Sequence, residues 1–346
     1  MRPPMDVCLT FDVEFSVSGA FARHESQKPK GIEVVECRAG GEEHGLGFIL
    51  DTLNRHSLKA TFFVETANVS YFGAAPMGEV VRRLLAAGQD VQMHLHPAWS
   101  VFKESNWRDR ILSGTPVDRC ADLPIDNFRN LLNEGKRQLI EWGAEPMAFR
   151  AGNMSVGPWM YRELQAAGFR TASNIALAVY PLSDRSLMLE SGVHLIDGVL
   201  ELPVLTYRSA IGPGLKRVKA LTIAGISGSN VEDVLDYAHK CGIGTAVVLM
   251  HPFDFVERDG DWAENIRPDP VTKGRFERLC ARLAAKPDKY RVVTFGGEIA
   301  DWSPTRLENS RQLVLPVHLF FKRLLYTAFD EVRAGLSCSA KEAKLA

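Results

Sequence analysis

Two histidines stand one residue apart in the stretch QMHLHPAW, at positions 94 and 96, directly before a proline. Successive side chains of a strand alternate between its two faces, so these imidazoles point to the same side. Imidazole nitrogen is a common ligand of zinc and of other divalent transition metals. The pair alone leaves two interpretations open, which are half of a metal site and packed side chains at the end of an ordinary strand.

Two carboxylates, Asp12 and Glu14, have the same spacing at the end of the apolar stretch DVCLTF. They also share one face of a strand. Two histidines and one carboxylate leave coordination positions open for water, whose pKa a divalent ion lowers toward neutrality. These residues therefore predict a hydrolytic metal site. The alternative is that the two carboxylates form a solvated strand end or a helix N-cap.

Two further ionisable residues lie in or after apolar runs. Arg150 in MAFRAGN would be costly to bury without a carboxylate partner, and Asp12 is the candidate. An ion pair that only stabilises the fold is the alternative. His251 ends the run TAVVLMH, and we interpret it as a proton donor or acceptor near neutral pH rather than as a capped core histidine.

Stretches of strand length alternate with stretches of helical length along the chain. Strands are predicted at 6–11, 60–66, 90–96, 146–151, 170–174, 193–197, 199–205, 245–251 and 290–295. Helices are predicted near 43–56, 77–87, 125–142, 157–167, 230–241 and 274–285. This alternation indicates an α/β fold with a mostly parallel sheet, and the even spread of strands favours a barrel. The ionisable residues then lie at the carboxyl ends of strands, where such folds gather their active sites.

No linker, low-complexity tract or internal repeat divides the chain. We expect a barrel domain over residues 1–303 and a C-terminal helical appendage and tail over 304–346. The apolar, basic-flanked segment 313–329 predicts a helix packed on the body or on another subunit of a homo-oligomer. A helix lying on a membrane surface, as a peripheral membrane contact, is the alternative.

The composition is that of an ordinary globular protein, with 46% hydrophobic residues, 24% charged residues and a formal net charge of -1. It lacks the basic excess of nucleic-acid-binding proteins, so no nucleic-acid partner is expected. The six cysteines are scattered without CxxC pairs, which favours reduced thiols. The N-terminal stretch lacks the apolar run and cleavage site of a signal peptide, and we expect a cytoplasmic protein.

Five stretches, in their order, resemble the motifs of the metal-dependent polysaccharide deacetylase family, which includes chitin and peptidoglycan N-deacetylases. They are LTFDVE (9–14), HLHPAW (94–99), FRAGN (149–153), LELPV (200–204) and LMHPFDF (249–255). The resemblance spans about residues 5–300 and depends on motif order and strand placement rather than on one motif. It implies the distorted (β/α)7 barrel of that family.

The resemblance also implies the metal ligands. Glu14, His94 and His96 match the ligand positions, and Asp12 matches the catalytic base, because Val13 stands where the family usually has its metal-binding Asp. An exchange of roles between Asp12 and Glu14 is the alternative. The family usually spaces its two histidines further apart than the HLH found here.

Further roles follow from the same resemblance. Arg150 matches the arginine that holds the catalytic Asp, His251 matches the general acid, and Leu249 matches the apolar wall for the acyl methyl group. The fourth motif matches least well, and either Asp197 or Glu201 is a candidate to orient His251.

These roles describe hydrolysis of an amide by metal-activated water, in which Asp12 takes a proton from water and His251 delivers one to the leaving nitrogen. One divalent ion is expected, with zinc preferred and cobalt, nickel, manganese or iron as alternatives. The expected substrate is an N-acylated sugar, with acetyl as the first choice of acyl group, in a glycan or a nucleotide- or lipid-linked precursor.

Substrate contacts are expected from Trp99, Asn153 and Leu249. The loops at 15–41 and 97–124 carry aromatic residues that either stack on a sugar or anchor the loops: Phe15, Phe21, Trp99, Phe102 and Trp107. Alternatives of other classes are a catalytically silent glycan-binding domain, a glycosidase and a hydrolase of a non-sugar linear or cyclic amide. Asp12 and Glu14 are too close in sequence to flank a glycosidic bond, which disfavours the glycosidase.

Overall fold

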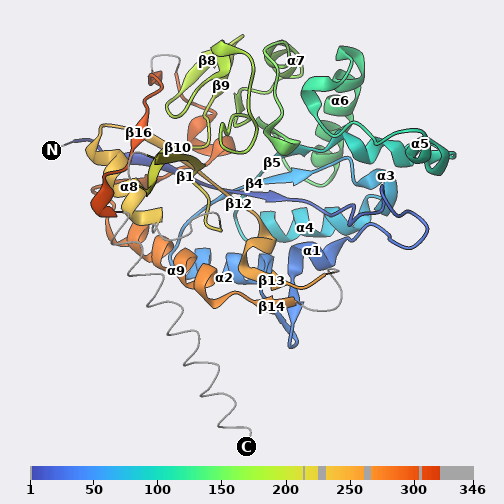
Figure 1. The fold of residues 1–346 in the computed structure, drawn as a ribbon, viewed down its shortest axis with the longest axis horizontal. Helices are drawn as coiled ribbons and strands as arrows, with labels where there is room; N and C mark the ends of the chain where they lie inside the picture. The colour runs from blue at the N-terminus through green and yellow to red at the C-terminus, as the bar shows by residue number, and fades with distance from the viewer. Residues whose placement is uncertain (1, 213–214, 225–230, 261–265, 304–305, 320–346) are drawn as a thin grey trace, which may run out of the picture.

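The computed structural model describes residues 2–212, 215–224, 231–260, 266–303 and 306–319. Its centre is a curled, mostly parallel sheet (Figure 1). Among the described residues the strands follow the order β12 (Thr245–Met250), β1 (Met5–Val13), β4 (Thr61–Glu65), β5 (Asp90–Leu95), β6 (Ala148–Ala151), β7 (Thr171–Ala172), β9 (Val199–Glu201) and β8 (His194–Ile196). Neighbours along this path are parallel except for the last pair, β9 and β8. A further strand, β15 (Tyr290–Val292), pairs with β1 in parallel.

Two short contacts connect the ends of this path. Val204, just after β9, forms a parallel bridge with Val247 of β12, and Thr222 forms one with Leu249 of the same strand. The backbone N–H of Leu205 donates to the carbonyl of Val247 at 3.2 Å. The sheet is thereby curled into an irregular barrel, and the predicted distorted (β/α)7 barrel is confirmed.

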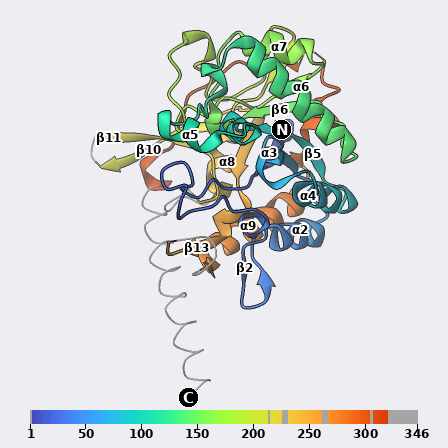
Figure 2. The same cartoon turned by 90° about the vertical axis from the view of Figure 1, so that its right-hand side faces the viewer.

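Helices cover the outside of the barrel (Figures 1 and 2). In the part of the chain that the structure describes, the α-helices are α1 (Ile32–Glu36), α2 (Leu46–Arg55), α3 (Val69–Phe72), α4 (Ala75–Ala86), α5 (Trp107–Ser113), α6 (Ile125–Glu141), α7 (Met160–Ala166), α8 (Val231–Lys240) and α9 (Pro270–Ala285). All six predicted helices are present. Helix α9 begins earlier than predicted, because Asp269 caps it by accepting a hydrogen bond from the backbone N–H of Val271 at 2.9 Å, and Pro270 occupies the first turn.

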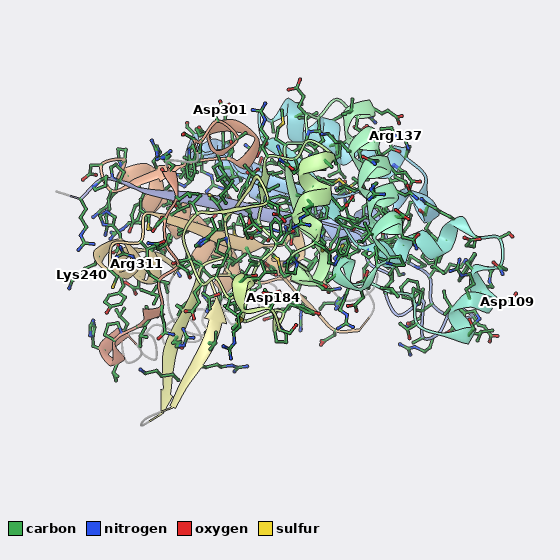
Figure 3. All side chains as sticks on the ribbon, turned by 90° about the horizontal axis from the view of Figure 1, so that it is seen from above. Asp109, Arg137, Asp184, Lys240, Asp301 and Arg311 are labelled. Carbon is green, nitrogen blue, oxygen red and sulfur yellow. The ribbon has the colours of Figure 1, made fainter. Side chains whose placement is uncertain are left out.

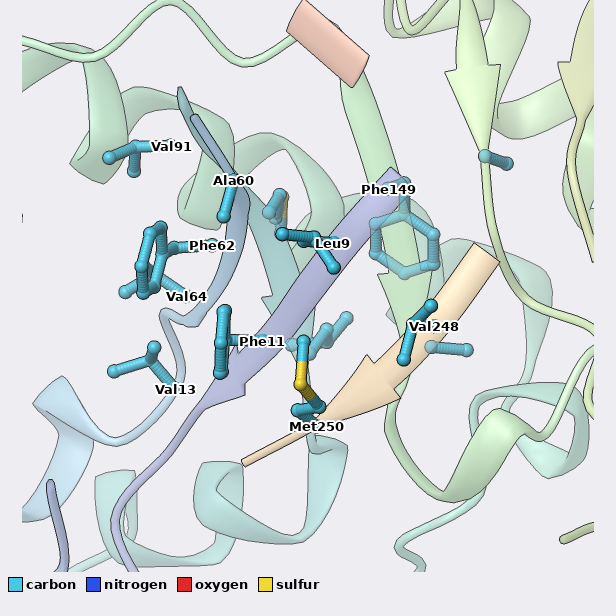
Figure 4. Packing of buried hydrophobic residues seen from close by; sticks show 14 of the residues in the cluster. Leu9, Phe11, Val13, Ala60, Phe62, Val64, Val91, Phe149, Val248 and Met250 are labelled. Carbon is cyan, nitrogen blue, oxygen red and sulfur yellow. The ribbon is translucent and has the colours of Figure 1, made fainter. Parts of the chain in front are cut away.

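Side chains of the central strands alternate between two hydrophobic clusters. Leu9, Phe11 and Val13 of β1 lie in the cluster between the sheet and the helices, where Phe11 stacks on Phe62 with ring centroids 5.0 Å apart (Figure 4). Cys8 of the same strand belongs to the second, smaller cluster inside the barrel. The side of β1 that carries Asp12 therefore faces the barrel interior, as strand periodicity requires.

Several elements occur in stretches for which no strand was predicted. The hairpin of β10 (Thr206–Gly212) and β11 (Leu215–Ala220) projects from the barrel (Figure 2). Two small antiparallel pairs lie at the bottom of the barrel in the same view: β2 (Arg38–Ala39) with β3 (Glu42–Glu43), and β13 (Val256–Arg258) with β14 (Ile266–Pro268). Charged side chains such as Asp109 and Arg137 lie at the periphery (Figure 3).

The described residues after the barrel, 306–319, lie against it. Strand β16 (Leu313–Val314) pairs in parallel with β10, and Arg306 forms an ion pair with Asp6 at 2.9 Å. The domain boundary at residue 303 stays a prediction, and the predicted segment 313–329 lies mostly outside the described residues. In the part of the chain that the structure describes, no helix is long and apolar enough to cross a membrane.

Candidate active site

Three predicted metal ligands meet at the carboxyl ends of β1 and β5. Glu14 follows β1 directly, His94 lies in β5, and His96 follows that strand. Oε2 of Glu14 is 2.9 Å from Nε2 of His96 and 3.4 Å from Nε2 of His94. One ligand atom from each residue lies within 4.8 Å of the other two. The structure thus brings together the three residues that sequence spacing placed on two strand ends.

The second nitrogen of each histidine has its own hydrogen-bond partner. Nδ1 of His94 is 3.0 Å from the backbone carbonyl oxygen of Arg150, and Nδ1 of His96 is 2.9 Å from Oδ2 of Asp118. Both partners accept hydrogen bonds, so a ring that binds a cation would keep a proton on Nδ1 and present the lone pair of Nε2 to the cation. This donor set, two imidazoles and one carboxylate, fits a divalent transition metal.

The pKa values of Glu14 and His96 depend on the charged groups around them. Burial alone would raise the pKa of the Glu14 carboxyl, but the neighbouring His96 and His94 lower this pKa well below its usual range. Burial would lower the pKa of His96, whereas Glu14 and Asp118 raise it well above the ordinary histidine value. Glu14 is therefore an anion over the whole neutral range, as a metal ligand must be.

Asp118 is a residue of the site that the sequence analysis missed. It lies on the irregular loop between α5 and α6, where no periodicity marks it. Its Oδ1 accepts a hydrogen bond from the backbone N–H of Ala98 at 3.3 Å. The side-chain amide of Asn153 donates to Oδ2 of Asp118 at 2.8 Å. Asn153, predicted to bind substrate, thus lines the pocket and also holds the carboxylate that orients His96.

Contacts to the backbone and to the ring fix the position of His96. Glu65, the fully buried last residue of β4, accepts hydrogen bonds from the backbone N–H groups of His96 and Ala67. Burial raises the pKa of Glu65 to about 7, although the two histidines partly oppose this. On the other side, a Cβ added to Gly152 would lie 2.7 Å from the ring of His96. The glycine of the FRAGN stretch therefore leaves the room that this ring requires.

Asp12 and Arg150 form a buried ion pair. NH1 of Arg150 donates to Oδ1 of Asp12 at 2.7 Å, and the arginine side chain is fully buried. Its other nitrogens donate to the backbone oxygen and Oγ of Ser173, both at 3.0 Å. The guanidinium carbon also lies 4.1 Å from the ring centroid of Phe63. The predicted partner of Arg150 is confirmed, and the contact fixes the Asp12 side chain facing the barrel interior.

His251 lies beside this pair at the end of β12. Its Nε2 is 4.0 Å from Oδ2 of Asp12, and its Nδ1 is 3.7 Å from Oδ2 of Asp254. The same Asp254 oxygen accepts a hydrogen bond from the backbone N–H of His251 at 2.8 Å. Burial would lower the pKa of His251, but Asp254, Asp12 and Glu14 raise it to about 9. The ring is therefore protonated at neutral pH and able to act as an acid.

The two residues proposed to orient His251 lie elsewhere. Asp197, in the turn between β8 and β9, pairs with Arg162 at 3.2 Å. Glu201 is fully buried and accepts a hydrogen bond from the hydroxyl of Tyr161 at 3.0 Å. Both expectations were wrong, because the fourth motif folds toward α7 rather than toward the pocket. The orienting carboxylate is the aspartate on the turn after His251, within the LMHPFDF stretch.

A pocket of about 330 Å³ opens at this end of the barrel. Its lining includes ionisable side chains described above. It also includes the apolar side chains of Met154, Val179 and Leu249. Leu249 is 4% exposed and precedes His251 by two residues on β12, so both face the same side of the strand.

The loop aromatics mainly contact one another. Trp99 is 2% exposed, with its ring centroid 5.9 Å from that of Phe72 and 5.8 Å from that of Phe102. Phe102 also packs against Phe21 and Trp107. For Trp99 the geometry fits the alternative in which these rings anchor the loops, because little of its surface remains for a sugar ring.

No protein-family model and no curated protein matches the sequence. Among solved structures, a protein described as a polysaccharide deacetylase from Mycobacterium smegmatis matches with a TM-score of 0.51 and 18% sequence identity, over 91% of this chain and 95% of that chain. A family 4 carbohydrate esterase from Streptomyces lividans matches with a TM-score of 0.42 and 13% identity, over 86% and 96% of the two chains. A 4-alpha-glucanotransferase from Thermococcus litoralis matches with a TM-score of 0.49 and 11% identity, over 91% of this chain and 42% of that chain.

The match to the M. smegmatis protein extends over nearly the whole of both chains. It confirms the fold that the five motifs implied, which is the distorted barrel of the polysaccharide deacetylases. The chemistry of this chain depends on its own side chains.

Proposed function

We propose that this protein is a metal-dependent hydrolase that removes an N-acyl group, in the first place acetyl, from an amino sugar in a glycan or glycan precursor. The observation that supports this most strongly is the convergence of Glu14, His94 and His96 beside Asp12 and His251 in one pocket. Each group needed for amide hydrolysis is present there: a ligand set, a base and an acid.

Glu14 and the two histidines would hold the ion. A divalent ion at this position supplies polarisation of the carbonyl group and a lowered pKa of water. Glu14 is favoured over Asp12 as the carboxylate ligand, because its Oε2 lies 3.4 Å or less from both Nε2 atoms. Asp12 is instead bonded to Arg150 at 2.7 Å. Zinc is the first choice, and cobalt, nickel, manganese and iron also accept this donor set.

Asp12 is the proposed base and His251 the proposed acid. Arg150 donates to one oxygen of Asp12 and fixes its direction, so that the other oxygen can take a proton from the attacking water. His251 has a pKa raised to about 9, and it donates a proton from Nε2 to the departing nitrogen. Leu249 in the pocket wall would contact the acyl methyl group. The products are a free amine and a carboxylate.

The test is release of acetate and free amine from three substrates: methyl N-acetylglucosaminide, a nucleotide-linked N-acetylated sugar and a lipid-linked one. Metal-stripped protein is assayed before and after addition of zinc, cobalt, nickel, manganese or iron(II). Release is expected after metal addition, with loss in Asp12→Asn and normal rates in the control Asp109→Asn, which changes an exposed aspartate. Metal uptake without amine release from any of these substrates would overturn the proposal and favour a silent glycan-binding domain.

A further inference from the structure

A second pocket, of about 370 Å³, adjoins the metal-ligand cluster. Glu14 and His96 line both this pocket and the one that contains Asp12 and His251. Of the described residues, these are the two that the pockets share. Glu14 and His96 therefore form the boundary between a reaction pocket and a second space. We call that second space the aromatic pocket, and its walls include Phe15, Val17, Phe21, Trp99, Pro116 and Phe253.

The walls of the aromatic pocket are mainly apolar. Beyond the shared pair, its polar wall residues are Ser16, Thr115 and Asp118. The Asp118 carboxylate already accepts hydrogen bonds from His96 and Asn153. A sugar ring needs several directional hydrogen-bond partners, whereas a hydrocarbon chain gains free energy from contact with such walls alone.

The rings that form the pocket are held in place by neighbouring rings. Phe15 packs against Phe72 with centroids 5.0 Å apart, and Trp99 also contacts Phe72. Phe21 stacks on Phe102 with centroids 5.8 Å apart. Side chains braced in this way keep the pocket open instead of collapsing into it, so a ligand would enter a largely preformed space.

We propose that the aromatic pocket binds a hydrocarbon chain that the substrate carries close to its scissile amide. This inference rests on the proposed function, because a carbonyl group placed at Glu14 and His96 brings its substituents to the pocket boundary. Of the described residues, Asp12 and His251 line only the reaction pocket, so the aromatic pocket contributes binding rather than proton transfer. The chain belongs either to the N-acyl group or to the aglycone of the sugar.

Two substrate series distinguish these sources. The first contains methyl glucosaminides with N-acetyl, N-butyryl and N-hexanoyl groups, and the second contains N-acetylglucosaminides with methyl, butyl and hexyl aglycones. In one series kcat/KM should rise by roughly fourfold per methylene, which corresponds to the ~0.8 kcal/mol gained by burying one CH₂. A flat or falling kcat/KM in both series would overturn the proposal.

Two variants test whether the rise of kcat/KM with chain length depends on the aromatic pocket. Val17→Asp places a charge in the aromatic pocket and should abolish the increase with chain length. Val117→Asp is the matched control, because Val117 is 48% exposed and lies outside the pocket wall, and it should keep the parental increase. Loss of the increase in both variants would contradict the assignment of the effect to this pocket.

A measurement of ligand binding tests the chain pocket independently of the proposed hydrolase activity. Calorimetry on the Asp12→Asn protein measures binding affinities without turnover. It compares the hexyl with the methyl glycoside, and the N-hexanoyl with the N-acetyl sugar. We expect at least tenfold tighter binding of either the hexyl glycoside or the N-hexanoyl sugar than of its short-chain counterpart. Such a preference, together with no amine release by the metal-loaded parent protein, would refute the hydrolase and keep the chain pocket, whereas equal affinities would refute the chain pocket whatever the activity.

Discussion

The carboxylate of Asp118 lies 2.9 Å from Nδ1 of His96, and this contact decides which nitrogen of the ring faces Glu14. A histidine ligand whose outer nitrogen is bonded to a carboxylate is oriented and made more basic. In the proposed metal site Asp118 would thus raise metal affinity without touching the ion.

Asp118→Asn should weaken zinc binding by about 10- to 100-fold, because it removes the charge that supports His96. The measurement is a competitive titration of metal-stripped protein with a chelator of known affinity. Asp122→Asn, on the same loop and bonded to Arg119, is the control and should bind zinc like the parent. An unchanged zinc affinity in Asp118→Asn would refute the orienting role.

The pKa of His251 predicts the alkaline limit of the reaction. A pKa raised to about 9 keeps the acid form present through neutral pH, and that form is lost as pH rises through this value. In Asp254→Asn the limit should move down toward ~6.5, the ordinary histidine value, because the nearest negative charge is gone. The dependence of kcat on pH measures this.

Asp259→Asn is the control for this profile, since Asp259 is exposed and pairs with Arg267. It should leave the alkaline limit at its parental pH. An alkaline limit that also stays in place in Asp254→Asn would show that another group is the acid.

Two substitutions of Asp12 should differ in their effect on stability. Asp12→Asn keeps an oxygen for Arg150, so the protein should remain folded while turnover falls by about 10²- to 10⁴-fold. Asp12→Ala leaves the fully buried guanidinium without its carboxylate and should lower the free energy of unfolding by about 3–5 kcal/mol. Chemical denaturation measures the difference.

The double variant Asp12→Ala with Arg150→Met is the matched control for the ion pair. It removes both charges, so much of the lost stability should return. Equal unfolding free energies for Asp12→Ala, Asp12→Asn and the parent protein would show that the pair does not stabilise the fold.

Strand periodicity predicted much of the site. Asp12 and Glu14, and likewise His94 and His96, share strand faces, and a parallel barrel brings strand ends to one rim. The Arg150 partner followed from the cost of burying an unpaired guanidinium. These inferences depend on regular geometry, which a sequence shows directly.

Other features depend on irregular backbone and were not predictable in the same way. Asp118 reaches His96 from a loop without periodicity, and Asp254 replaces Asp197 and Glu201 because a tight turn folds it back onto His251. The burial of Trp99 depends on Phe72 of α3, which is distant in sequence, as well as on the nearby Phe102. Such contacts are set by tertiary packing, which local sequence patterns do not encode.

The central claim is that Glu14, His94 and His96 hold one divalent ion, and calorimetric titration of metal-stripped protein with zinc tests it most directly. The parent protein and the control His239→Ala, on α8, should bind one zinc ion per chain. His94→Ala should lose this binding while keeping the melting temperature of the metal-stripped parent. Zinc bound by His94→Ala with the affinity of the parent would contradict the account.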